Sequence, residues 1–155
     1  MEPKEFRVLW EMRGEISKDW QGDILYKSPL PKDIKSIYIE FHFSKREILD
    51  DGTLEDQCRK AISCNDASVE LDQEQIQVFM KRPKAELNLS VIVDGFCAGS
   101  AHYDATEKYI ELSADKASLG FIPCKIEGLL EVQIKVFNVV QDHTPYRLVV
   151  KGGNQ

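Results

Sequence analysis

The side chains best suited to chemistry in this sequence are its three histidines and the acidic groups beside them. His102 precedes Asp104 by two positions, and His143 directly follows Asp142. A histidine near a carboxylate is an arrangement that hydrolases and metal sites use. One hypothesis is therefore a small hydrolase or metal-binding protein that uses His102, Asp104 and a cysteine. The third histidine, His42, lies on the polar side of an alternating segment, and we interpret it as solvent-exposed.

The cysteines are the other reactive groups, and they are scattered along the chain. None forms the close pair, separated by two residues, that a structural zinc site uses. We expect free thiols in a reducing cytosol, with two of the four near the core. The four are Cys58 and Cys64, and the two expected near the core, Cys97 and Cys124. Nucleophile elbows, phosphate-binding loops and dinucleotide-binding glycine motifs are absent from the sequence. The sequence thus favours a non-catalytic protein without cofactor or metal over an enzyme.

Aromatic residues near the same loop support a second hypothesis, which is binding. Tyr103 lies between His102 and Asp104, and Trp20 and Tyr109 are further aromatic residues in or near predicted loops. Aromatic platforms combined with hydrogen-bonding groups are typical of carbohydrate and peptide sites. These five residues form the candidate surface for a partner protein or a small polar ligand. The alternative is that the tryptophan and Tyr103 merely cap the core.

Alternating apolar residues predict the strands that must position these side chains. The alternation covers residues 6–13, 24–26, 36–43, 76–80, 87–93, 109–113, 130–136 and 146–150. Gly14 is expected to interrupt the first strand, and Asp94-Gly95 to form a turn. Residues 99–104 are expected to be a loop. Eight short strands predict an all-β fold, an antiparallel β-sandwich that is either jelly-roll or Ig-like.

One stretch has a helical period instead. Thr53 and Asp56 have the spacing of a capping box, in which a side chain at the helix start accepts a backbone hydrogen bond. The apolar residues that follow recur at helical spacing, at Leu54, Cys58, Ala61 and Ile62. We therefore expect one short helix near residues 53–63, inserted in a single β-sandwich domain over residues 1–155.

Charge and hydropathy narrow the classes of partner. The chain of 155 residues has a net charge of −6 with both signs interspersed. Nucleic-acid binding is built largely from clustered Lys and Arg, so this balance argues against it. No segment approaches the roughly 18 apolar residues of a membrane span, and the first residues lack the apolar run of a signal peptide. We expect a cytoplasmic protein that does not bind membranes, and its oligomeric state stays open.

Three segments together resemble a known family. Residues 30–39 look like a proline turn and strand, and residues 89–100 resemble a central strand with its turn and glycine-rich continuation. Residues 117–150 are similar to a third pattern, which runs from a Gly-aromatic-x-Pro turn through a long strand to a closing strand. This set resembles the accessory β-sandwich that precedes the PHP catalytic domain in some bacterial metal-dependent phosphoesterases. The resemblance covers the accessory domain alone. It implies a non-catalytic module, accessory to a separate hydrolase.

Overall fold

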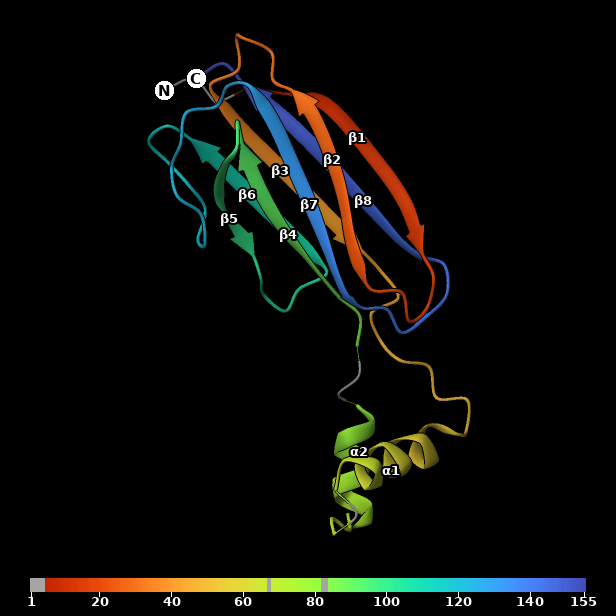
Figure 1. Ribbon diagram of the computed structural model, residues 1–155. Helices are drawn as coiled ribbons and strands as arrows, with labels where there is room; N and C mark the ends of the chain where they lie inside the picture. Colours follow the sequence, from red (N-terminus) through yellow and green to blue (C-terminus); the bar gives the residue numbers. More distant parts are fainter. Residues whose placement is uncertain (1–4, 67, 82–83) are drawn as a thin grey trace.

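The computed structural model describes residues 5–66, 68–81 and 84–155, and these form two stacked sheets of four strands each (Figure 1). All strand pairs are antiparallel. One sheet has the order β1-β8-β3-β6, formed by Phe6–Ile16, Thr144–Gly153, Ser36–Phe43 and Glu107–Ser113. The other has the order β2-β7-β4-β5, formed by Gly22–Pro29, Leu129–Asn138, Glu86–Val93 and Phe96–Ala101. The expected all-β antiparallel sandwich is confirmed.

The strand order distinguishes between the two topologies that the sequence leaves open. Successive strands alternate between the sheets, except that β4 and β5 are neighbours in one sheet. The last strand, β8, inserts between β1 and β3, and β7 inserts between β2 and β4. This arrangement is the double-sheet jelly roll. The chain is therefore a jelly roll and not an Ig-like sandwich.

The core lies between the sheets and is built by residues that alternate along the central strands. Successive side chains of a strand point to opposite faces, so every second residue faces the other sheet. In β4 and β7 the inward residues are almost completely buried; they are Leu87, Leu89, Val91, Val93, Leu130, Val132, Ile134 and Val136. Burial of such apolar surface is the main favourable contribution to folding. The period of two predicted for these segments is thus the reason that one face of each strand is buried in the core.

The β4–β5 hairpin agrees with the predicted turn but corrects the predicted loop. Asp94 and Gly95 both have positive φ angles, 48° and 80°, which suit a tight hairpin turn. The segment that follows was expected to be a loop from Gly99, whereas β5 continues to Ala101. Small residues gave no apolar alternation there. Gly99 has a φ of 146°, and a Cβ at this position would lie 2.2 Å from the carbonyl oxygen of Gly120, so only glycine fits.

The first strand is longer than predicted. Gly14 was expected to interrupt it, but β1 continues to Ile16 and pairs with β8 along this whole length. A Cβ on Gly14 would lie 2.5 Å from the hydroxyl oxygen of Tyr146. The glycine therefore admits a large neighbouring ring, which is a recognised use of glycine within strands.

Two helices interrupt the β topology between β3 and β4. Helix α1, Leu54–Asn65, confirms the helix expected near residues 53–63. Helix α2, Gln73–Met80, replaces the strand predicted over residues 76–80, and that prediction was wrong. Neither described helix is long and apolar enough to cross a membrane.

Residues 76–80 were predicted to be a strand because their apolar residues alternate. The capping box before them, which starts a helix, was not taken into account. The carboxylate of Asp72 accepts a hydrogen bond from the backbone N–H of Gln75 at 2.8 Å, and the Gln75 side chain accepts one from the Asp72 N–H at 3.1 Å. This reciprocal pair starts a helix. The capping box expected at Thr53 does not form, because the Thr53 side chain makes no cap hydrogen bond.

The two helices form a helical hairpin, residues 50–81, that lies beyond one end of the sandwich (Figure 1). Each helix packs mainly against the other, not against a sheet. A short stem joins the hairpin to the sandwich: the N–H of Ala85 donates to the carbonyl of Arg46 at 2.8 Å, and Glu47 bridges to Lys84. Both sheets are thus complete without the hairpin, which is an insertion between β3 and β4 at one end of the sandwich.

A strap, residues 114–128, covers the edges of β5 and β6 at one side of the sandwich. Its turn is closed by the N–H of Phe121, which donates to the carbonyl of Ser118 at 3.0 Å. The strap then bonds to both edge strands, through Ile122 to Ala98 and through Cys124 to Ser113. Edge strands present unpaired backbone groups that favour unwanted pairing. The strap therefore protects this side of the jelly roll.

Candidate functional site

The structure does not bring the five predicted site residues together. Trp20 lies in the β1–β2 connection, whereas residues 102–104 lie in the β5–β6 connection. Both connections are at the end of the sandwich from which the hairpin extends (Figure 1). They occupy opposite sides of that end, because β1 and β2 are the edge strands on one side and β5 and β6 are those on the other. One surface that includes both loops is therefore excluded.

The β5–β6 loop is held in place by Lys108. Its ammonium group donates to the carbonyls of Tyr103, at 2.9 Å, and Ala105, at 2.7 Å. It also lies 4.9 Å from the centroid of the Tyr103 ring, within the range of a cation–π contact. Tyr103 is thus an anchor of this loop, although 45% of it stays exposed.

Lys108 is a buried titratable residue that the sequence analysis missed. Only 1% of the residue is exposed, and burial lowers the pKa of its side chain to about 8, an effect that nearby Arg46 reinforces and Glu86 opposes. Desolvation disfavours the charged form of an amine. The alternation of Lys108 with Ile110 and Leu112 was the signal that could have placed it on the inward face.

Asp104 links the β5–β6 loop to the stem of the hairpin. Its carboxylate pairs with the guanidinium of Arg46 and, at 3.0 Å, with the ammonium of Lys84. Both cations lie in the stem. The carboxylate is therefore engaged in ion pairs with the stem and is not oriented by the histidine two residues before it.

His102 lies on the outer side of the other sheet. Its ring is edge-on to the ring of Phe137 in β7, with centroids 5.3 Å apart. His102 therefore makes an aromatic contact, and the described residues give it no acid–base partner.

The other two candidate residues lie on separate surfaces. Tyr109 lies on the outer face of the first sheet, where its ring stacks on Tyr38 with centroids 6.4 Å apart. The Tyr109 hydroxyl donates to Glu107 at 3.1 Å, and this bond raises the pKa of the phenol. Trp20 packs over Gly22, where a Cβ would lie 2.9 Å from its ring. This contact is local, with the first residue of β2, and 41% of Trp20 stays exposed.

A hydrolase or metal site receives no geometric support. Among the described residues, no group of three or more His, Cys, Asp or Glu side chains is arranged to hold a metal ion. All four cysteines are free thiols in the described part of the chain. Cys97 is exposed, which corrects its expected place near the core, and Cys124 is partly buried. Burial raises the pKa of the Cys124 thiol, which disfavours the nucleophilic thiolate.

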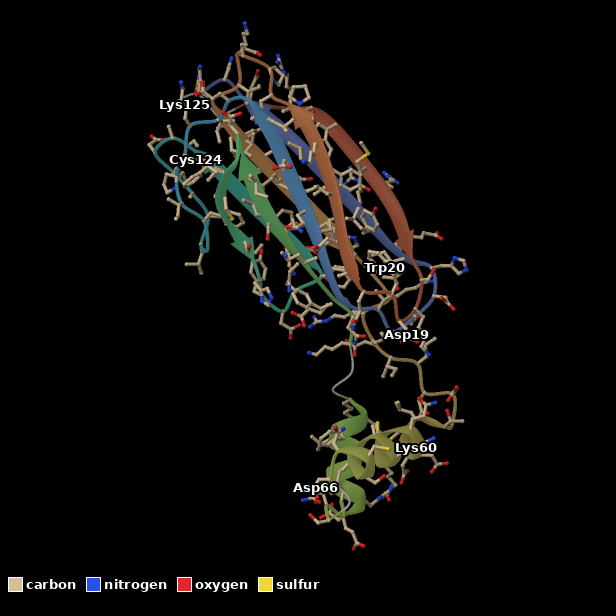
Figure 2. The ribbon with its side chains drawn as sticks, viewed as in Figure 1. Asp19, Trp20, Lys60, Asp66, Cys124 and Lys125 are labelled. Carbon is tan, nitrogen blue, oxygen red and sulfur yellow. The ribbon has the colours of Figure 1, made fainter. Side chains whose placement is uncertain are left out.

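The hairpin holds a surface that sequence reasoning missed. Figure 2 shows Lys60 and Asp66 on this hairpin, well away from Trp20 and Cys124. Among the described residues of the two helices, Leu54 and Ile76 are the buried ones. By contrast, Val78 is 52% exposed. The signal that could have revealed the second helix is the Asp-x-x-Gln capping pattern before it.

Side chains between the helices hold the hairpin in its shape. Arg59 of α1 donates to the carboxylate of Glu55 at 3.0 Å and to the carbonyl of Leu71 at 3.2 Å. It also donates to the side-chain oxygen of Gln73, at 3.2 Å. This single guanidinium joins the first helix to the segment ahead of the second, so the exposed face of α2 has a defined position.

The net negative charge of the chain is concentrated on the hairpin. Residues 50–81 contain eight acidic and three basic side chains, which leaves −5 of the total net charge of −6. The sandwich is thus nearly neutral. A strongly charged surface steers association with groups of the opposite sign.

Comparison with known families identifies the family of this chain. The model of the Family of unknown function (DUF6669) matches residues 6–154. The chain belongs to this family. The DUF6669 match runs from β1 to β8 and includes the hairpin. The comparison with curated proteins gave no match. The DUF6669 description mentions neither a phosphoesterase nor a PHP domain, so the resemblance to the PHP-associated sandwich stays a prediction.

Proposed function

We propose that this chain is a non-catalytic β-sandwich module that binds a partner protein, and that the helical hairpin makes the contact. One observation carries the proposal: the hairpin extends from the sandwich and keeps apolar side chains in solvent. Val69 and Val78 are 41% and 52% exposed. Exposed apolar clusters with polar rims mark interaction sites in soluble proteins.

The energetics of the hairpin support the same conclusion. The helices have 12 and 8 residues, and isolated helices below about 12–15 residues are marginal in water. Most helical stability in proteins comes from packing an apolar face. The hairpin buries little besides Leu54 and Ile76. A partner that covers its exposed face would supply the missing burial.

A small polar ligand at the β5–β6 loop has less support. The polar groups of this loop already satisfy one another: Asp104 pairs with Arg46 and Lys84, and Lys108 binds two carbonyls. A ligand would have to displace these bonds.

The resemblance to PHP-associated sandwiches supports a separate hydrolase as the partner. In this proposal the chain is an accessory protein of the bacterial cytoplasm, and four free thiols suit that compartment. The alternative of a small hydrolase or metal protein using His102, Asp104 and a cysteine is tested directly. The tests are elemental analysis of the purified protein and a panel of phosphoesterase and esterase substrates. Absence of a metal and of activity would refute the alternative.

The experiment for the proposed function removes the hairpin and keeps the sandwich. Replacing residues 50–81 by a short Gly-Ser linker leaves the stem intact, because the stem bonds lie outside that range. We expect the tagged full chain to co-purify at least one protein from its native cells in a fixed stoichiometric ratio, and the shortened chain to lose it. Co-purification of the same proteins by both chains, with the sandwich folded in each, would overturn the proposal.

A further inference from the structure

We infer that the α2 side of the hairpin docks a helical segment of the partner whose apolar face is flanked by Lys and Arg. This inference rests on the proposed function, since it specifies the chemistry of the partner at the same hairpin. It concerns one surface, here called the α2 groove. The groove is lined by Leu71, Asp72, Glu74, Gln75, Val78 and Phe79.

The floor of the α2 groove is apolar. Leu71 lies just before the helix, and Val78 and Phe79 lie in its last turn; the phenylalanine is 38% exposed. Residues three and four positions apart share one face of a helix, so Gln75 and Val78 form a continuous row with Leu71 at one end. Such a row is about the size that anchors from successive turns of a partner helix require.

The rim of the α2 groove is acidic. Asp72 and Glu74 line it. Glu70, directly before Leu71, lines the neighbouring pocket together with Arg59 and Lys60. In the described part of the chain, the carboxylates of Glu70 and Glu74 take part in no hydrogen bond or ion pair. Unpaired carboxylates around an apolar floor complement a partner that carries cations around an apolar stripe. Lys81 lies at the far end of α2, so the partner's cations pair with the first turn of the helix.

The form of the partner follows from the backbone of the hairpin. A partner strand would need an unpaired strand edge to extend. The backbone of α2 is bonded within the helix, and its start is closed by the capping box at Asp72. The hairpin therefore offers side chains and no open ladder. An amphipathic helix, which recognises its target by side chains at successive turns, is the form that fits.

The test measures binding of a defined probe to the full chain. The probe is a fluorescent peptide of about 18 residues, or five helical turns, with Leu on one face and Lys elsewhere. We expect binding that weakens as salt is raised, since screening reduces attraction between exposed charges. The double variant Glu70→Lys with Glu74→Lys should raise the Kd by about tenfold or more, and Val78→Gln by about threefold.

Matched controls separate the α2 groove from general acidity. Glu15→Lys with Glu127→Lys makes the same change in net charge on the sandwich, and Leu119→Gln removes a residue that is 98% exposed on the strap. These controls should leave the Kd within about twofold. If the Glu70→Lys and Glu74→Lys variant loses its helix, the double variant Glu70→Gln with Glu74→Gln replaces it in the binding test. Its helix content is checked by circular dichroism.

The outcomes distinguish this inference from the proposed function. Absence of peptide binding, equal weakening by the sandwich controls, or equal binding of a peptide with Glu in place of Lys would overturn the inference. It would also be overturned if a protein lost on hairpin removal still co-purifies with the Glu70→Lys and Glu74→Lys variant. In each of these cases the proposed function stands or falls separately, on the removal experiment alone.

Discussion

The sandwich and the hairpin use apolar side chains in opposite ways. In the sandwich, the inward residues of both sheets pack into one buried cluster. In the described hairpin, Leu54 and Ile76 are buried while Val69 and Val78 face solvent. The hairpin also carries most of the net negative charge, −5 of −6. The comparison indicates that stability resides in the sandwich, whereas the hairpin is held by few contacts; in our proposal the hairpin serves recognition.

The largest effect is expected in the centre of the sandwich. Leu89 of β4 is completely buried between two neighbouring strands. Leu89→Ala should lower the free energy of unfolding by about 2–5 kcal/mol, because a cavity adds to the lost transfer energy. Urea denaturation followed by tryptophan fluorescence measures this change. Leu119→Ala, at a fully exposed site, should stay within about 0.5 kcal/mol; equal losses for both variants would contradict the prediction.

A core substitution in the hairpin should act locally. Ile76 is completely buried within the hairpin. Ile76→Ala should remove about 2 kcal/mol or more from the stability of the hairpin and leave that of the sandwich within about 0.5 kcal/mol, since distant sites act independently. Hydrogen exchange should show lost protection in both helices and unchanged protection in the strands. Lost protection in β4 and β7 would show that the two regions fold as one unit.

The two helix starts should differ by a smaller amount. Asp72 caps α2 through a real capping box, whereas the Thr53 side chain makes no cap hydrogen bond to α1. Asp72→Ala should cost about 1 kcal/mol of helix stability, and Thr53→Ala much less. Circular dichroism of the full chain, with hydrogen exchange to assign the helix, measures both. A larger loss for Thr53→Ala would mean that Thr53 caps α1 in solution.

A pH dependence is expected at the hairpin end of the sandwich. Burial lowers the pKa of Lys108 to about 8 from its ordinary value of 10.5, with Arg46 and Glu86 as the charged neighbours. Between these values the unfolded chain binds more protons than the native one, so stability rises with pH across this window. Below about pH 8 the lysine is protonated in both states, and it contributes no slope.

Comparison of the wild type with Lys108→Met isolates this contribution. The difference in their free energies of unfolding should change between about pH 8 and 9.5, below the range where tyrosines titrate. The limit matters because burial raises the pKa of Tyr146, which gives stability the opposite slope at higher pH. A difference that stays constant with pH would show that Lys108 titrates normally.

Much of the sandwich followed from local patterns. Residues 87–93 and 130–136 alternate with a period of two, and half of each segment must then face a core. The turn at Asp94-Gly95 could be predicted because these residue types tolerate positive φ angles. Helix α1 could be predicted from the helical spacing of its apolar residues. These features depend on residues within one element, so the sequence determined them by itself.

The candidate site depended on contacts between distant elements, and there the sequence was a poor guide. Residues 76–80 alternate like a strand, but a cap at Asp72 and the lack of a neighbouring strand made them a helix. Trp20 and His102 were grouped by residue type, while the order of the strands put them on opposite sides of the sandwich. Alternation shows which residues face inward, but not which strands become neighbours.

The sequence by itself determined an all-β sandwich with an inserted helix, because burial periods and turn residues act locally. Only the tertiary structure decided the jelly-roll strand order, the second helix and the place of the hairpin beyond the sandwich. Strand order is set by packing between residues far apart in the chain. Packing between distant residues also decides exposure. Val78 is exposed because α2 lies outside the sandwich core, and the sequence pattern does not show this.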